Sequence, residues 1–324
     1  MHGLDAETRE HVFIGHAFEE RRVDLGEIRM NYTTVGSPEL PALLLIPGQS
    51  ESWWGYEAAL HLLAGHFQAF AVDLRGQGRS TWTPGRYTLD NMGNDLVRFI
   101  DVVIGRETIV SGLSSGGVLS AWLSAYAKPG QIVGALYEDP PLFHSELHPA
   151  FGQSIRQSLG PMFAMWNKWL GDQWSIGDWA GMQAAAATEL PAWIAAVAPT
   201  RDAPPQNLRE YDPEWGRAFW SGTVAASCDH ARMLSAVKVP VLITHHFRHV
   251  DADSGHLMGA LSDLGAAKAR DLVASTGQTV DYRSFPAMGH SMHGQDPELF
   301  AKTLIEWSTS LARPAADRAE SADS

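Results

Sequence analysis

The 324-residue chain has a single cysteine, Cys228, and few basic residues, with 24 Lys and Arg against 37 Asp and Glu and a formal charge of −13. One cysteine excludes an internal disulfide. No Lys/Arg-rich run could follow a phosphate backbone, so nucleic acid is not an expected partner. No apolar run is long enough to cross a bilayer, and residues 1–18 lack the apolar stretch of a secretory signal. We therefore expect a cytoplasmic protein with no membrane partner.

The most informative stretch, residues 108–127, contains the pattern G-x-S-x-G between strand-forming and helix-forming residues. This is the pattern of a nucleophile elbow, a tight strand-to-helix turn that presents one serine above the edge of a sheet. Gly112 and Gly116 allow the backbone to approach closely at such a turn. The pattern predicts Ser114 as a nucleophile. It also predicts that the backbone N–H of Ser115, at the start of a helix, stabilises negative charge beside Ser114.

Short apolar runs alternate with helix-like segments on both sides of this turn. The runs that read as buried strands are residues 42–46, 67–72, 108–111, 131–137, 239–244 and 279–285. Helices are expected between them, among them residues 257–276, and a closing helix is expected after the last strand at residues 297–311. This alternation predicts an α/β fold with a mostly parallel central sheet and helices on both faces.

The alternation stops at residues 142–231, which contain no strand-like run and more than half of the twelve tryptophans. We predict a helical cap inserted after the strand that follows the nucleophile helix. The chain then divides into a core (1–141), the cap (142–231), the second part of the core (232–312) and a disordered tail (313–324). Trp215 and Trp220 flank a short helix near the return to the core, and we expect both to face a substrate crevice.

A serine nucleophile needs a base, which in this arrangement follows the last strand. His290 lies there and is the predicted base, with His293 as the alternative. A carboxylate must orient the imidazole. Asp139 ends the strand before the cap and precedes two prolines that hold the chain rigid. Asp251 and Asp253 lie in the loop where this carboxylate is more commonly found. We favour Asp139 over these two.

A developing oxyanion needs a second backbone donor. It is expected from the loop after residues 42–46, where Gly48 allows the chain to turn and the N–H of Gln49 can point inward. Gly48 is also expected to line the substrate site.

Two groups of histidines are compatible with metal binding. His245, His246 and His249 lie close together, and His144 and His148 have the spacing of ligands on a helix. Neither group is accompanied by cysteine or by a suitably placed glutamate. We predict neither a metal nor a cofactor.

The order of Ser114, Asp139 and His290, together with the turn at 73–80 and the insertion, resembles the α/β-hydrolase superfamily with a lid. The likeness covers residues 21–312. More narrowly, residues 47–54, 112–117 and 137–141 are similar to bacterial zearalenone hydrolases, lactonases that open the macrolactone of a resorcylic mycotoxin. Fungal counterparts place a glutamate after the same strand, so the resemblance supports Asp139 as the acid.

The resemblance implies a lactonase that forms an acyl-enzyme on a small apolar lactone or ester and needs no cofactor. Alternatives are a carboxylesterase or C–C hydrolase acting on another aromatic substrate, or a small-ligand receptor of the same fold. Epoxide hydrolase and haloalkane dehalogenase chemistry is disfavoured because those enzymes have an aspartate in place of Ser114. The sequence leaves a homo-oligomer open.

Overall fold

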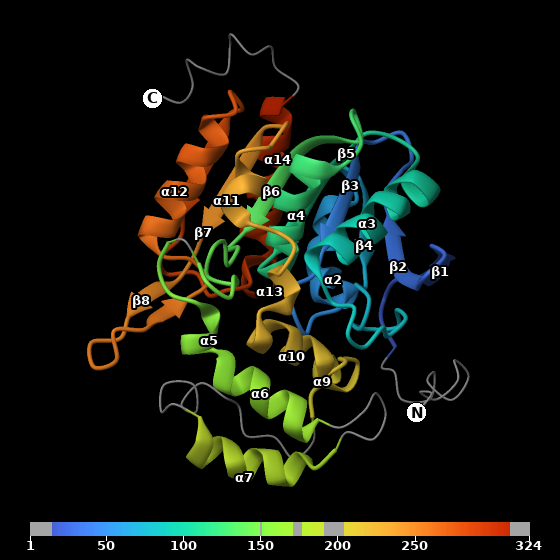
Figure 1. Ribbon diagram of the computed structural model, residues 1–324. Coiled ribbons are helices and arrows are strands. Elements are labelled where there is room, and N and C mark those ends of the chain that lie inside the picture. The colour runs from blue at the N-terminus through green and yellow to red at the C-terminus, as the bar shows by residue number, and fades with distance from the viewer. Residues whose placement is uncertain (1–14, 150, 171–176, 191–203, 312–324) are drawn as a thin grey trace.

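The computed structural model describes residues 15–149, 151–170, 177–190 and 204–311 (Figure 1). Within them, eight strands form one sheet in the order β1-β2-β4-β3-β5-β6-β7-β10. Strands β1 and β4 are antiparallel to β2, and all other neighbours are parallel. The strands are β1 (Glu20–Asp24), β2 (Arg29–Val35), β3 (Ala42–Ile46), β4 (Gln68–Val72), β5 (Thr108–Leu113), β6 (Ile132–Glu138), β7 (Val241–His245) and β10 (Val280–Ser284). The predicted α/β fold with a mostly parallel sheet is confirmed.

The central strands are buried on both faces, as their continuous apolar sequences predict. In β3, Leu44 and Ile46 belong to one hydrophobic cluster, and Leu43 and Leu45 belong to another on the opposite face. The first cluster includes α3 (Leu89–Phe99), α4 (Ser115–Tyr126) and α12 (Asp263–Ala274), and the second includes α2 (Glu57–Leu63) and α14 (Pro297–Leu311). Shorter elements of the core are η1 (Trp53–Tyr56), η2 (Ile100–Ile104) and α13 (Met292–Gln295).

The described residues between β6 and β7 form helices. Most of these helices gather at one end of the sheet (Figure 1). They are α5 (Ile155–Ser158), α6 (Gly160–Trp169), α7 (Trp179–Glu189), α9 (Gln206–Arg209), α10 (Glu214–Ser221), η3 (Thr223–Ala225) and α11 (His230–Leu234). The predicted cap boundary at residue 231 falls inside α11, which packs on the core helices α4 and α12. The predicted tail, 313–324, lies outside the described residues.

The segment after α9 attaches these helices to the core. Tyr211 forms an isolated antiparallel bridge with Gln77. The indole N–H of Trp215 donates to the carbonyl of Arg75 at 2.7 Å, and its ring stacks on Tyr87 with a centroid separation of 5.4 Å. Trp215 is fully buried. This tryptophan is therefore a packing residue between the inserted helices and the core.

The predicted helix at 257–276 begins later than expected. Residues 257–259 form β9 (Leu257–Gly259), which pairs with β8 (Arg248–Val250) in a separate antiparallel hairpin. Helix α12 then starts after Ser262, whose side chain accepts the Gly265 N–H at 3.0 Å. Because Ser262 is an effective N-cap, it sets the start of the helix, and the hairpin takes the residues before it. No helix in the described part of the chain has both the length and the apolar character needed to span a bilayer.

Candidate active site

The nucleophile elbow predicted from the sequence is present between β5 and α4. Ser114 has φ 55° and ψ −120°, a strained conformation for a residue with a side chain. A Cβ built on Gly112 would lie 2.2 Å from the Gly116 carbonyl oxygen, and one on Gly116 would lie 2.3 Å from the Ile46 oxygen. Both positions therefore require glycine. The Ser114 N–H donates to the carbonyl of Glu138 at 2.8 Å, which holds the turn against β6.

The structure brings Asp139 and His290 together. Asp139 follows β6, is 1% exposed, and has its backbone N–H bonded to the Thr244 carbonyl at 2.9 Å. Its Oδ2 lies 2.7 Å from His290 Nδ1, and its Oδ1 accepts the backbone N–H of His246 at 3.1 Å. The carboxylate thus holds the proton on Nδ1 and leaves Nε2 as the basic nitrogen.

Two opposing effects act on the pKa of His290. Burial lowers this pKa, whereas the hydrogen bond and the charge of Asp139 raise it. The second effect is larger, so the net pKa lies above the ordinary value for histidine. Asp139 therefore stabilises an imidazolium at this position.

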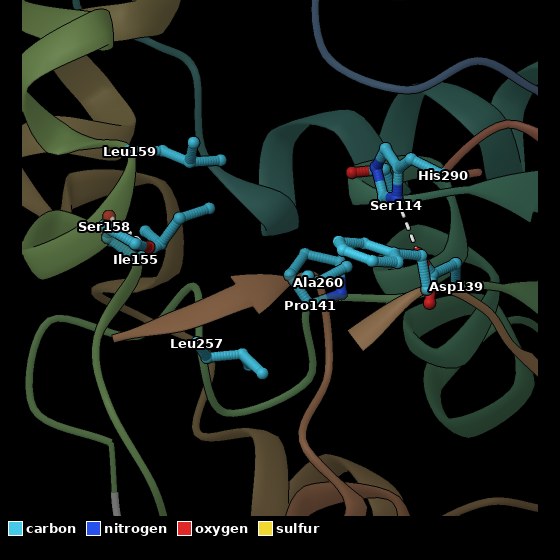
Figure 2. Close-up of a pocket in the computed structure, with 11 residues that line it drawn as sticks. Ser114, Asp139, Pro141, Ile155, Ser158, Leu159, Leu257, Ala260 and His290 are labelled. Atoms are coloured by element: carbon cyan, nitrogen blue, oxygen red, sulfur yellow. Dashed lines mark hydrogen bonds and ion pairs between the residues drawn. The ribbon is translucent and has the colours of Figure 1, made fainter. Parts of the chain in front are cut away.

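Ser114, Asp139 and His290 line one cavity of about 250 Å³. Figure 2 shows Ser114, Asp139 and His290 on one side of it and Ile155, Ser158 and Leu159 of the inserted helices on the other. No hydrogen bond joins the Ser114 hydroxyl to His290 among the described residues, and such bonds are often long in the absence of substrate. The remaining lining residues are Pro141, Phe247, Leu257, Gly259 and Ala260. The wall is mostly apolar and combines α5 with the β8–β9 hairpin.

The predicted oxyanion loop lies against Ser114. A Cβ built on Gly48 would be 3.4 Å from the Ser114 Cβ, although Gly48 is not among the lining residues of the cavity. Neither the Gln49 nor the Ser115 backbone N–H donates to a protein acceptor in the described part of the chain. The Gln49 side chain donates to the Tyr211 hydroxyl at 2.6 Å. Two backbone donors are therefore available close to Ser114.

The two tryptophans expected in the substrate site lie elsewhere. Trp215 does not face this cavity as expected, because it is buried with its indole N–H bonded to the Arg75 carbonyl. Trp220 is 45% exposed, and neither residue lines this cavity. Both tryptophans lie on the amphipathic helix α10. The spacing of apolar residues along this helix identifies its apolar face, but it does not show whether that face contacts a cavity or another helix.

The alternative triad residues have other partners. Asp251 accepts the backbone N–H and the hydroxyl of Ser254, within the loop that joins β8 to β9, and Asp253 is exposed. His293 is paired with Glu138. Of the three candidate acids, Asp139 is the one that contacts His290.

The histidines considered as metal ligands have protein partners or are exposed. His245 bonds to Tyr282 and to the Leu261 carbonyl, and His144 lies 3.1 Å from the Ser158 hydroxyl. His249 lies on β8 and is exposed. Across the described ranges, no group of three or more His, Cys, Asp or Glu is arranged to hold a metal ion.

Sequence reasoning missed two sets of contacts beside the candidate triad residues. His246 Nδ1 lies 3.0 Å from the carbonyl oxygens of Gly289 and His290, which ties the His290 loop to the end of β7. Glu138 and His293 form a buried pair beside it. The sequence did contain a signal for this pair, since Glu138 lies next to Asp139 at the end of a predicted buried strand. A buried glutamate requires a partner, so a second histidine or another cation could have been expected near it.

This strand order with a serine elbow at the carboxyl end of β5 defines a hydrolase-type α/β architecture. A model of the Alpha/beta hydrolase family matches residues 43–303, and the chain belongs to this family. The protein is thus a member of a hydrolase family in which fold alone does not define the substrate.

Three known proteins illustrate the similarity. The chain is 28% identical over 102 residues to 3-oxoadipate enol-lactonase 2 of Acinetobacter baylyi, which is 31% of this chain and 38% of that protein. It is 28% identical over 145 residues to epoxide hydrolase 4 of Mus musculus, or 43% and 40% of the two chains. The crystal structure of an enol-lactonase from Burkholderia xenovorans matches with a TM-score of 0.61 and 17% identity, over 89% of this chain and all (100%) of that one.

These likenesses have limited reach. The matches span about a third to two-fifths of the length of the curated relatives. At 17% identity, the likeness to the solved enol-lactonase concerns the fold alone.

Proposed function

We propose that the protein is a serine hydrolase of carboxylic esters that opens lactones, with zearalenone or a related resorcylic lactone as its substrate. The observation that carries the proposal is the 2.7 Å contact between Asp139 and His290 at a cavity that Ser114 also lines. The predominantly apolar wall of that cavity favours an apolar substrate.

In the proposed reaction, His290 Nε2 accepts the proton of the Ser114 hydroxyl while Oγ attacks the lactone carbonyl carbon. The backbone N–H groups of Gln49 and Ser115 donate to the resulting oxyanion. Collapse breaks the ring C–O bond, and the leaving alkoxide takes the proton from His290. Water, deprotonated by His290, then attacks the acyl-enzyme and releases the hydroxy acid and Ser114. Asp139 stabilises the imidazolium in both halves of the reaction.

The size of the cavity favours a second candidate substrate. Its volume of about 250 Å³ is below the roughly 300–1,000 Å³ typical of ligand sites. A simple aryl ester or small lactone fits such a volume, whereas a macrolactone requires the wall formed by Ile155, Ser158 and Leu159 to move outward. An aryl carboxylesterase is therefore the alternative.

The chemistry of Ser114 argues against epoxide hydrolysis, despite the similarity to epoxide hydrolase 4. Attack of a serine oxygen on an epoxide would leave an ether on the enzyme, which water does not cleave. A carboxylate nucleophile instead leaves an ester, which water can hydrolyse. With serine at the elbow, acyl transfer is the reaction that completes a catalytic cycle.

The test is an assay of the purified protein on a panel of p-nitrophenyl esters, small lactones and zearalenone, with Ser114→Ala as the control. We expect multiple turnovers that the substitution abolishes. Faster cleavage of aryl esters than of zearalenone would favour the carboxylesterase. Stoichiometric binding of lactones with no release of acid over many equivalents would instead identify a ligand receptor and contradict the proposal.

A further inference from the structure

A second histidine–carboxylate pair lies beside the candidate triad. Glu138, next to Asp139 in the chain, is fully buried at the end of β6. Its Oε2 lies 2.9 Å from His293 Nδ1, and its Oε1 accepts the backbone N–H groups of Met292 at 2.7 Å and His293 at 3.1 Å. The proposed reaction uses neither of these side chains, so their burial together calls for another explanation.

The surroundings of this pair stabilise its charged form. Burial alone would lower the pKa of His293, but the charge and hydrogen bond of Glu138 raise it, and the net pKa is raised. Burial would likewise raise the pKa of Glu138, yet His293 lowers it overall. The ring of His293 stacks on Tyr56 with a centroid separation of 3.8 Å and is 1% exposed. The raised pKa of His293 and the lowered pKa of Glu138 both favour the ion pair of these two buried side chains.

The His293 ring also lies near the predicted oxyanion loop. Nε2 of His293 lies 3.9 Å from Oε2 of Glu51. The same Glu51 oxygen accepts the backbone N–H of Gly48 at 3.2 Å, and the Glu51 N–H donates to the Gly48 carbonyl at 3.3 Å. Because Gly48 lies against Ser114, a displacement of this turn would move the neighbouring Gln49 N–H away from an oxyanion.

We propose that His293 and Glu51 are positioning residues: the His293 ring, held by Glu138, positions the Glu51 carboxylate, which accepts the Gly48 N–H and so fixes the turn that carries the Gln49 N–H. The inference rests on the proposed function, since it concerns the oxyanion donors of that reaction. These side chains act by electrostatic attraction and by packing, and no proton is transferred between Glu138, His293 and Glu51.

Glu51→Ala tests the proposal directly, because it removes both the charge and the acceptor for the Gly48 N–H. We expect kcat for p-nitrophenyl acetate to fall about 10- to 100-fold and KM to change less than about threefold, since a displaced oxyanion donor weakens the transition state alone. Glu51→Gln keeps an acceptor oxygen and should lose less. Glu27→Gln is the matched control, because both side chains are 27% exposed and Glu27 pairs with Arg75 instead.

A second measurement separates positioning from general stability. A fluorophosphonate probe presents a phosphoryl oxygen to the same donors, so Glu51→Ala should label more slowly while its melting temperature stays close to that of the wild type. A fall in melting temperature with an unchanged labelling rate, or an unchanged kcat, would overturn the inference. If the wild type neither reacts with the probe nor cleaves esters, the proposed function itself fails. If the wild type does both and Glu51→Ala behaves like it, only the positioning role fails.

A double-mutant cycle tests the link through His293. His293→Gln should lower kcat by a factor similar to that of Glu51→Ala, and the double variant should lose little more, because both act through one turn. Fully multiplicative losses would contradict the link. The Glu51 variants decide the question even if His293→Gln fails to fold, because Glu51 is partly exposed.

Discussion

Replacing Asp139 with asparagine tests the role of the acid through a specific change of tautomer. One carboxylate oxygen of Asp139 accepts the His246 N–H at 3.1 Å, and the other contacts His290 Nδ1 at 2.7 Å. In Asp139→Asn the amide oxygen is retained by the His246 N–H, so the amide NH₂ faces His290. Nδ1 must then accept a hydrogen bond, the ring proton moves to Nε2, and the base is lost.

The expected loss in kcat is large because the side chain is 1% exposed and water cannot readily replace it. A wrong tautomer costs about 10⁴-fold in a serine triad, and we expect roughly 10³- to 10⁴-fold here, measured with p-nitrophenyl acetate. Asp251→Asn is the matched control, since that carboxylate bonds within its own loop and should leave kcat within about twofold. Retention of more than a tenth of the wild-type kcat by a folded Asp139→Asn variant would refute the reasoning.

Three further outcomes are expected. Ester cleavage requires neutral His290, so kcat/KM should fall as the pH falls through the raised pKa of this histidine. If the midpoint of that fall lay below the ordinary histidine pKa of about 6.5, the contribution of Asp139 would be contradicted. Trp215→Phe leaves the buried Arg75 carbonyl without its donor and should lower the free energy of unfolding by about 1–3 kcal/mol in a denaturant titration. Its kcat should be unchanged, whereas a fall in kcat without loss of stability would place Trp215 at the substrate. Burial raises the pKa of the Cys228 thiol to about 12, so a disulfide reagent should modify the native protein far more slowly than the unfolded chain.

Short-range patterns predicted much of this molecule. The turn at Ser114 requires glycine at two positions, and both lie within a five-residue pattern that can be read from the sequence. The apolar runs of β3, β5 and β6 likewise identify buried strands without knowledge of the neighbouring strands. Asp139 was distinguished from Asp251 by the rigidity of the chain beside it and by family resemblance. In the structure, Asp139 contacts His290, whereas Asp251 bonds within its own loop.

Contacts between distant segments were not predictable in the same way. Glu138 and His293 are 155 residues apart, and nothing local to either residue identifies the other as its partner. The apolar face of α10 was recognisable, but whether it meets a cavity or the turn at Arg75 depends on how the whole insertion docks. The hairpin of β8 and β9 escaped prediction because its strands are three residues each, too short for a period to be visible.

The most direct test of the account is to trap the acyl-enzyme. Wild-type protein mixed with p-nitrophenyl acetate and quenched in acid within one turnover should carry one acetyl group, which peptide mass spectrometry should locate on Ser114. Ser114→Ala should carry none. Turnover without a Ser114 adduct, or hydrolysis that persists in Ser114→Ala, would contradict the central claim that this serine is the nucleophile.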